Sequence, residues 1–316
     1  MKNEMHTVLG ANGPIGKAVI KELEIRQLQI RKVSRKPTWV QADLLRKEDA
    51  ERAIDGSSHV YLCIGLPYNS KIWETQWPQI MQNVIDACEK AQAKLIFLDN
   101  IYMYASPLPI PFDEGTHQNP ISKKGKARKQ TADIMMKALK ENKIKGLIGR
   151  SADFYGEGAV NSPFYISFLE RMLQGKNPQT LVSAEIEHTY ANVLDNGRAL
   201  VEMALCDDCY DQVWHLPVGE QITTNGMLAL FNKKLGGNFK VSVMPKFLKM
   251  ILPIFIPILK ETKEMEYQFE QKYVMSDHKF RERFPNFKVS SYQDGVNSMV
   301  DWFKAIKNKT AAANKK

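Results

Sequence analysis

The stretch Gly10-Ala-Asn-Gly13-Pro-Ile-Gly16 stands between an apolar run, residues 6–9, and an amphipathic run, residues 14–24. Its glycines suit a tight turn from a strand into a helix, the approach of a pyrophosphate to the backbone, and close packing of the helix on the strand. The start of such a helix offers free N–H groups and a positive dipole end to phosphates. The residues predicted to form this dinucleotide-binding loop are Gly10, Asn12, Gly13, Pro14, Ile15 and Gly16. Because the spacing is G-x-x-G-x-x-G and not G-x-G-x-x-G, a purely structural turn is the alternative.

Apolar runs and helical patterns alternate from this loop to about residue 150. The expected strands are residues 6–9, 29–33, 59–63, 94–98 and 145–148. The expected helices are residues 14–24, 46–54, 70–91 and 126–141. Alternation at this pitch predicts an α/β fold with right-handed crossovers, that is, a doubly wound parallel sheet of the Rossmann type.

The pattern changes beyond residue 150. Helical spacing recurs at residues 164–174, 192–205 and 225–235, and a short strand is expected at 213–216. We expect a Rossmann domain of residues 1–155 that also receives 188–216. Residues 156–187 and 217–316 are expected to form a smaller, mixed α/β substrate-binding region. The proline-bounded apolar segment 247–259 is interpreted as a helix over the substrate cleft, with a membrane-touching patch as the alternative.

Composition narrows the function classes. The 316 residues are 44% hydrophobic and 25% charged, which excludes collagen-like and disordered chains. Four cysteines exclude a disulfide scaffold, and the lone pair Cys206 and Cys209 gives no metal-site pattern. The net charge of +9 comes without interleaved aromatics or a recognition helix, so no specific nucleic-acid partner is expected. Without a signal peptide or an apolar run long enough for a membrane span, we expect a cytoplasmic protein.

The end of the second strand indicates which dinucleotide is bound. It reads Val33-Ser34-Arg35-Lys36 and has no carboxylate to hold ribose hydroxyls. Ser34 and Arg35 are suited to a 2′-phosphate through hydroxyl and charge-assisted hydrogen bonds. We therefore predict that the chain binds NADP(H) in preference to NAD(H). The alternative is that Arg35 is only a solvated surface charge.

Further motifs resemble the extended short-chain dehydrogenase/reductase superfamily, whose members include NAD-dependent epimerases and dehydratases. The similar stretches are the glycine loop, Asp43-Leu44, Cys63-Ile-Gly65, Asn83-Val-Ile-Asp-Ala87, Arg150-Ser-Ala-Asp-Phe-Tyr155-Gly156 and Asn192-Val-Leu-Asp195. The resemblance implies that Asp43 and Leu44 contact adenine and that Gly65 lies against the cofactor. It also implies a small-molecule substrate such as a nucleotide sugar, and a homodimer through helices 70–91 and 126–141. The basic start of the second of these helices opposes that pairing by like-charge repulsion.

The chain departs from this superfamily at the catalytic centre. Where the family has a Ser/Thr after the fifth strand, Asn100 stands, followed by Tyr102 and Tyr104. Where the family has Tyr-x-x-x-Lys, the chain has Lys124-Gly-Lys-Ala-Arg128. The resemblance implies that Arg128 holds the nicotinamide ribose. The residues predicted to replace the usual acid/base set are Asn100, Tyr102, Tyr104 and Arg128.

Three function classes follow from these observations. The first is an NADP(H)-dependent oxidoreductase, or an epimerase/dehydratase-like enzyme for nucleotide sugars, with a rebuilt acid/base set. The second is a non-enzymatic NADP(H)-binding sensor or regulatory protein, which the missing Tyr and Lys favour. The third, an assembly protein with a vestigial nucleotide fold, is opposed by the intact glycine loop.

Overall fold

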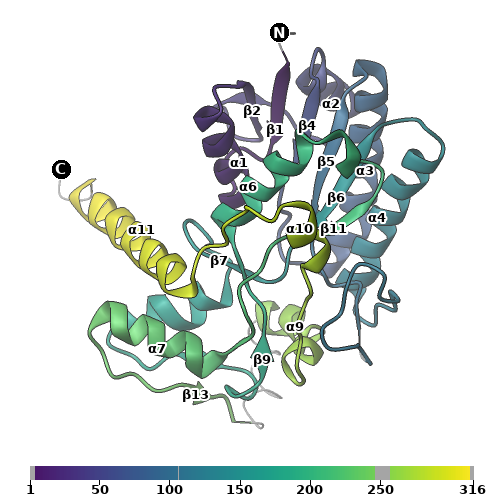
Figure 1. Cartoon of the computed structure of the whole chain (residues 1–316). Coiled ribbons are helices and arrows are strands. Elements are labelled where there is room, and N and C mark those ends of the chain that lie inside the picture. The colour runs from purple at the N-terminus through teal and green to yellow at the C-terminus, as the bar shows by residue number, and fades with distance from the viewer. Residues whose placement is uncertain (1–3, 106, 246–256, 314–316) are drawn as a thin grey trace.

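The computed structural model describes residues 4–105, 107–245 and 257–313 of the chain. Seven parallel strands form a central sheet in the order β11-β6-β5-β4-β1-β2-β3 (Figure 1). These strands are β1 Met5–Leu9, β2 Gln29–Ser34, β3 Val40–Gln41, β4 His59–Leu62, β5 Lys94–Asp99, β6 Gly146–Arg150 and β11 Val213–His215. The predicted doubly wound parallel sheet is confirmed, and its strand order reverses between β1 and β4.

Helices cover both faces of this sheet. Helices α1 (Pro14–Ile25) and α6 (Val193–Ala204) pack together on one face. The opposite face carries α2 (Lys47–Ile54), α3 (Ser70–Ala91) and α4 (Lys123–Lys140). Successive β4 side chains point to opposite faces, as strand geometry requires. Val60 and Leu62 therefore pack under α3, whereas Tyr61 and Cys63 pack under α1 and α6.

Helix α4 begins three residues before the predicted start at residue 126, because Ser122 caps it. The Ser122 hydroxyl accepts a hydrogen bond from the Gly125 amide at 3.0 Å. A Cβ on Gly125 would lie 2.3 Å from the carbonyl oxygen of Tyr102, so the helix start packs directly on the segment that follows β5. This contact brings Lys124 to the carboxyl edge of the sheet.

The remaining elements form a smaller region below that edge (Figure 1). Its paired strands are β7 Phe154–Tyr155 with β10 Ala191–Asn192, β9 Glu187–His188 with β12 Ile222–Thr223, and β8 Gln179–Thr180 with β13 Ser242–Val243. Its helices are the π-helical segment Phe164–Leu169, α5 Glu170–Met172, α7 Thr224–Leu235, α9 Pro257–Lys263 and α11 Tyr292–Ala313. Helix α10 (His278–Arg283) lies instead beside β11 of the central sheet. Asp207–Cys209 and Glu266–Phe269 are 3-10 helices. The predicted helix at 247–259 lies outside the described residues except for its end in α9. Within the described part of the chain, no helix has the length and apolar character needed to cross a membrane.

Candidate functional site

The loop after β1 packs against the end of β4, where the strand order reverses. Gly10 has a φ of +94°, and a Cβ on it would lie 2.7 Å from the carbonyl oxygen of Cys63. A Cβ on Gly16 would lie 2.2 Å from the carbonyl oxygen of Gly10. Both positions therefore require glycine. At Gly13 the nearest atom would be 3.3 Å away, so packing alone does not explain this third glycine.

The N-terminus of α1 is open to an anion. The helix begins at Pro14 after Gly13, no side chain caps it, and its first turn has no acidic residue. Proline suits this first position because it has no N–H to satisfy. Ile15 is buried beneath the loop, and the Asn12 side-chain oxygen accepts a hydrogen bond from the Trp39 indole at 3.0 Å. The positive end of the helix dipole thus lies at the switch point, where doubly wound sheets bind their ligands.

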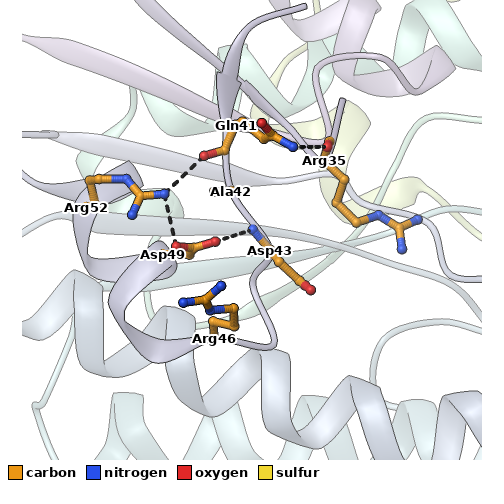
Figure 2. A pocket seen from close by; sticks show the side chains of 7 residues that line it. All are labelled: Arg35, Gln41, Ala42, Asp43, Arg46, Asp49 and Arg52. Carbon is orange, nitrogen blue, oxygen red and sulfur yellow. Dashed lines mark hydrogen bonds and ion pairs between the residues drawn. The ribbon is translucent and has the colours of Figure 1, made fainter. Parts of the chain in front are cut away.

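A hollow of about 530 Å³ lies beside the ends of β2 and β3. Its lining residues are Arg35, Gln41, Ala42, Asp43, Arg46, Asp49 and Arg52 (Figure 2). Arg52 is paired with Asp49 at 2.9 Å. The Asp43 amide, which donates to Asp49 at 2.9 Å, and the Arg52 guanidinium both lower the pKa of Asp49. In contrast, the exposed guanidinium groups of Arg35 and Arg46 have no hydrogen-bonding or ion-pairing partner in the described part of the chain, and they are available to an anion.

The other predicted cofactor residues follow the same edge of the sheet. Ser34 is buried, and its hydroxyl already donates to the carbonyl oxygen of Lys36 at 2.8 Å. Asp43 is half-buried and Leu44 is buried. Gly65 is exposed, and an added Cβ would meet no atom within 4 Å, so crowding does not demand glycine there.

Arg128 is committed to a buried ion pair at the end of β5. Its Nε donates to Asp99 at 2.8 Å and its Nη2 to the carbonyl oxygen of Leu98 at 3.1 Å. The guanidinium carbon lies 4.1 Å from the ring centre of Trp77, and Arg128 is 3% exposed. The second oxygen of Asp99 lies 3.6 Å from Arg150. The structure thus brings Arg128 to the catalytic edge with its charge already neutralised.

Lys124, four residues before Arg128, is also neutralised. It is fully buried, and its ammonium group donates to both Glu261 and Glu264, the latter at 2.7 Å. The same carboxylates accept hydrogen bonds from the amides of Ser70 and Lys123, at 2.9 Å each. The segment from α9 to Glu264 therefore places two carboxylates on the N-termini of α3 and α4.

The chain turns after Asn100, so Tyr102 and Tyr104 enter different surroundings. The Asn100 side-chain oxygen accepts a hydrogen bond from the Tyr102 amide at 3.2 Å and thereby fixes the turn. Tyr102 is half-buried, stacks on Trp73 with ring centres 6.0 Å apart, and hydrogen-bonds the Tyr68 side chain. Burial raises the pKa of Tyr102 well above its ordinary value, so it is a protonated phenol at neutral pH.

Tyr104 belongs to an interior hydrogen-bond network. Its hydroxyl accepts from Arg150 at 2.6 Å and lies 3.0 Å from Nε2 of His215. Nδ1 of His215 lies 2.8 Å from the carbonyl oxygen of Ser276, so it carries the proton and Nε2 accepts from Tyr104. Burial raises the pKa of Tyr104 and lowers that of His215 to about 3. Tyr104 is fully buried, so a ligand does not reach its hydroxyl in this conformation.

Residues 6–216 match the NAD dependent epimerase/dehydratase family. The chain belongs to this family. Its match spans the whole central sheet, including the glycine loop and the edge that carries Lys124 and Arg128. The resemblance to the extended short-chain dehydrogenase/reductase superfamily is thereby confirmed. Comparison with curated proteins gave no match.

Three solved structures with the same fold are distant from this chain in sequence. The UDP-glucuronic acid 4-epimerase of Bacillus cereus, in complex with NAD, has a TM-score of 0.78 at 16% identity, covering 96% of this chain and 97% of that one. The UDP-glucose 4-epimerase of Thermus thermophilus, also with NAD, has a TM-score of 0.76 at 18% identity, with coverages of 95% and 99%. The dTDP-glucose 4,6-dehydratase of Streptomyces venezuelae has a TM-score of 0.78 at 12% identity, with coverages of 96% and 98%. At these identities the likeness establishes the fold.

Asp153 is a further acidic residue at this edge of the sheet. It follows β6 and precedes β7, at the same carboxyl edge as Asn100 and Tyr102. Removal from water raises the pKa of Asp153 to about 6. The available signal was its position, because a carboxylate directly after a strand end of a doubly wound sheet lies where ligands bind.

Proposed function

We propose that this family member binds NADP(H) along the carboxyl edge of its sheet and modifies a nucleotide sugar by a redox reaction of the epimerase or dehydratase kind. The observation that carries the proposal is the glycine loop. An added Cβ would lie within 2.7 Å of a backbone atom at Gly10 and at Gly16, whereas at Gly13, next to an uncapped helix start, the crowding is milder, at 3.3 Å. A pyrophosphate accounts for the third glycine, because a side chain there would separate it from the backbone.

The residues along the edge fit a dinucleotide with a 2′-phosphate. The glycine loop would hold the pyrophosphate, Arg35 with Ser34 the 2′-phosphate, Asp43 and Leu44 the adenine, and Gly65 and Arg128 the nicotinamide half. The unpartnered guanidinium groups of Arg35 and Arg46 support NADP(H), since an unpaired cation next to the adenosine ribose has no role with NAD(H). When bound, the nicotinamide exchanges a hydride with the substrate.

For proton transfer, the chain offers neutral hydroxyls at this edge. Tyr102 is the half-buried tyrosine and is proposed as a proton donor. Tyr104 would act through Arg150 and His215, as a residue that positions the end of β6. Asn100 would hold the turn that presents Tyr102. Substrate binding is assigned to residues 156–187 and 217–316.

A non-enzymatic NADP(H)-binding sensor is the second candidate. Lys124 and Arg128 favour it, because both cations at the positions of the family's catalytic pair are buried in ion pairs. A sensor would need the loop and the arginines but no acid/base set.

Mass spectrometry of small molecules released on denaturing the purified protein is the decisive first experiment. Recovery of one NADP⁺ or NADPH per chain is expected for an enzyme that regenerates its cofactor within one turnover. If the site is empty, titration with NADPH and NADH follows, and at least tenfold tighter binding of NADPH is expected. Binding of neither nucleotide would overturn the proposal. Turnover of a nucleotide sugar separates the enzyme from the sensor.

A further inference from the structure

Asp153 differs from the other acidic groups at the carboxyl edge because its carboxylate has no partner. Within the described residues, no hydrogen bond or ion pair reaches it, although the side chain is only half-buried. Its backbone carbonyl accepts from the Ala191 amide at 3.0 Å, which fixes the residue between β6 and β10. In contrast, Asp99 is paired with Arg128, and Glu261 and Glu264 are paired with Lys124.

Five tyrosines interact electrostatically with this carboxylate. Their electrostatic interaction with Asp153 involves residues from five different segments, namely Tyr68, Tyr102, Tyr190, Tyr267 and Tyr273. Burial raises the pKa of each of them, so they are neutral phenols at physiological pH. The charged groups beyond them are Lys124 with Glu261 and Glu264, and the Lys124 ammonium lies 4.4 Å from the ring centre of Tyr68.

Three of the five tyrosines already hydrogen-bond other groups, Tyr190 through the Thr224 side chain. The Tyr273 hydroxyl donates to the carbonyl oxygen of Ile101 at 2.9 Å, and that of Tyr267 lies 3.4 Å from the carbonyl oxygen of Tyr102. Tyr68 and Tyr102 hydrogen-bond each other through their side chains. An unpartnered carboxylate next to this phenol pair is a geometry for moving protons, because a carboxylate accepts and a phenol donates.

We infer that Asp153 is the acid/base of the reaction, with the Tyr68–Tyr102 pair beside it, and this inference rests on the proposed function. A substrate alcohol would give the hydrogen on its carbinol carbon, as a hydride, to an oxidised nicotinamide dinucleotide. The alcohol would thereby become a carbonyl compound. The hydroxyl proton goes to the Asp153 carboxylate. The electron pair of the C–H bond ends in the reduced cofactor, and the electron pair of the O–H bond ends in the C=O bond. The reverse step returns proton and hydride.

A carboxyl titration tests the chemistry of this residue without a substrate. Carbon-13 NMR of aspartate-labelled protein, assigned with Asp153→Asn, is expected to show one carboxyl that titrates near pH 6. A midpoint at or below its ordinary value of 3.8 would overturn the inference, since the group would then be too weak a base.

Turnover tests the role itself, with UDP-glucose, UDP-N-acetylglucosamine and dTDP-glucose as probes and NADP⁺ or NAD⁺ added. Asp153→Asn is expected to lower kcat by a factor of about 10² to 10⁴ and to remove the acidic limb of the pH profile near pH 6. NADPH affinity is expected to stay the same, and Asp133→Asn, which removes an exposed carboxylate on α4, is the matched control. Activity of Asp153→Asn within threefold of wild type would overturn the assignment alone. No turnover of any probe by wild type would overturn the proposed enzyme function and the assignment with it.

Discussion

The two ends of the ligand-binding edge hold their cations in opposite ways. Beside β2 and β3, Arg35 and Arg46 are exposed and unpaired. Beside β5 and β6, Lys124 and Arg128 are buried and neutralised by carboxylates. An exposed guanidinium is available to an anion at little cost, whereas a buried pair has to be broken first. This difference supports the proposals that the β2–β3 end recognises an anion and that the β5–β6 end uses neutral hydroxyls and one carboxylate.

The largest expected effect comes from removing the buried ion pair between Arg128 and Asp99 at the β5–β6 end. Arg128→Met leaves Asp99 buried with only Arg150 nearby, at 3.6 Å, and is expected to lower the free energy of unfolding by about 3–5 kcal/mol. Urea unfolding at pH 7 measures it. The neighbouring Lys129→Met removes an exposed pair with Asp133 and should cost at most about 0.5 kcal/mol. Equal losses of unfolding free energy in both variants would mean that the buried Arg128–Asp99 pair stabilises the fold no more than the exposed pair does.

The glycine loop, which joins the two ends, gives the next largest effect. Gly16→Ala puts a methyl group 2.2 Å from a backbone oxygen and is expected to destabilise the fold by about 1–3 kcal/mol. Gly13→Ala meets its nearest atom at 3.3 Å, so its melting temperature should stay close to wild type. If a pyrophosphate approaches this loop, Gly13→Ala should nevertheless weaken NADPH binding more than tenfold. Unchanged affinity, measured by calorimetry, would make the loop a structural turn only.

At the β5–β6 end, the raised pKa of Asp153 should make the stability of the fold depend on pH. Its pKa is about 6 in the folded chain against an ordinary 3.8, so the folded state binds the proton more tightly. The stabilisation by this proton is complete below pH 3.8 and is lost as the pH rises towards 6. Asp153→Asn does not titrate. It is therefore expected to be more stable than wild type by about 3 kcal/mol at pH 8 and to lose this advantage below pH 4. A constant difference across this range, in thermal melts, would contradict the raised pKa.

The β2–β3 end was largely predictable from the sequence, and the β5–β6 end was not. The glycine spacing and the residues after the second strand are contiguous signals, so the turn at Gly10 and Gly16 and the place of Arg35 at the strand end could be predicted from local rules. The neutralisation of Lys124 depends on Glu261, which is 137 residues away. An extended chain would put Tyr102 and Tyr104 on one side, but the turn at Asn100 separates them. Long-range pairing and an irregular turn leave no periodic signal.

The smallest expected effect concerns the choice between the two dinucleotides at the open end. Arg35→Ala removes one of two unpaired guanidinium groups and is expected to weaken NADPH binding by about 10- to 30-fold, since a charge-assisted hydrogen bond contributes about 1.5–3 kcal/mol and Arg46 remains in the same hollow. NADH binding should change less than about twofold, because NADH has no 2′-phosphate. Lys36→Ala, next to Arg35 and exposed, is the matched control and should leave the preference intact. Fluorescence titration of both nucleotides at two salt concentrations measures this, and the NADPH affinity of wild type should fall more steeply with salt. Equal losses for NADPH and NADH in Arg35→Ala would show that Arg35 does not recognise a 2′-phosphate, and the contrast between the two ends would then reduce to exposure alone.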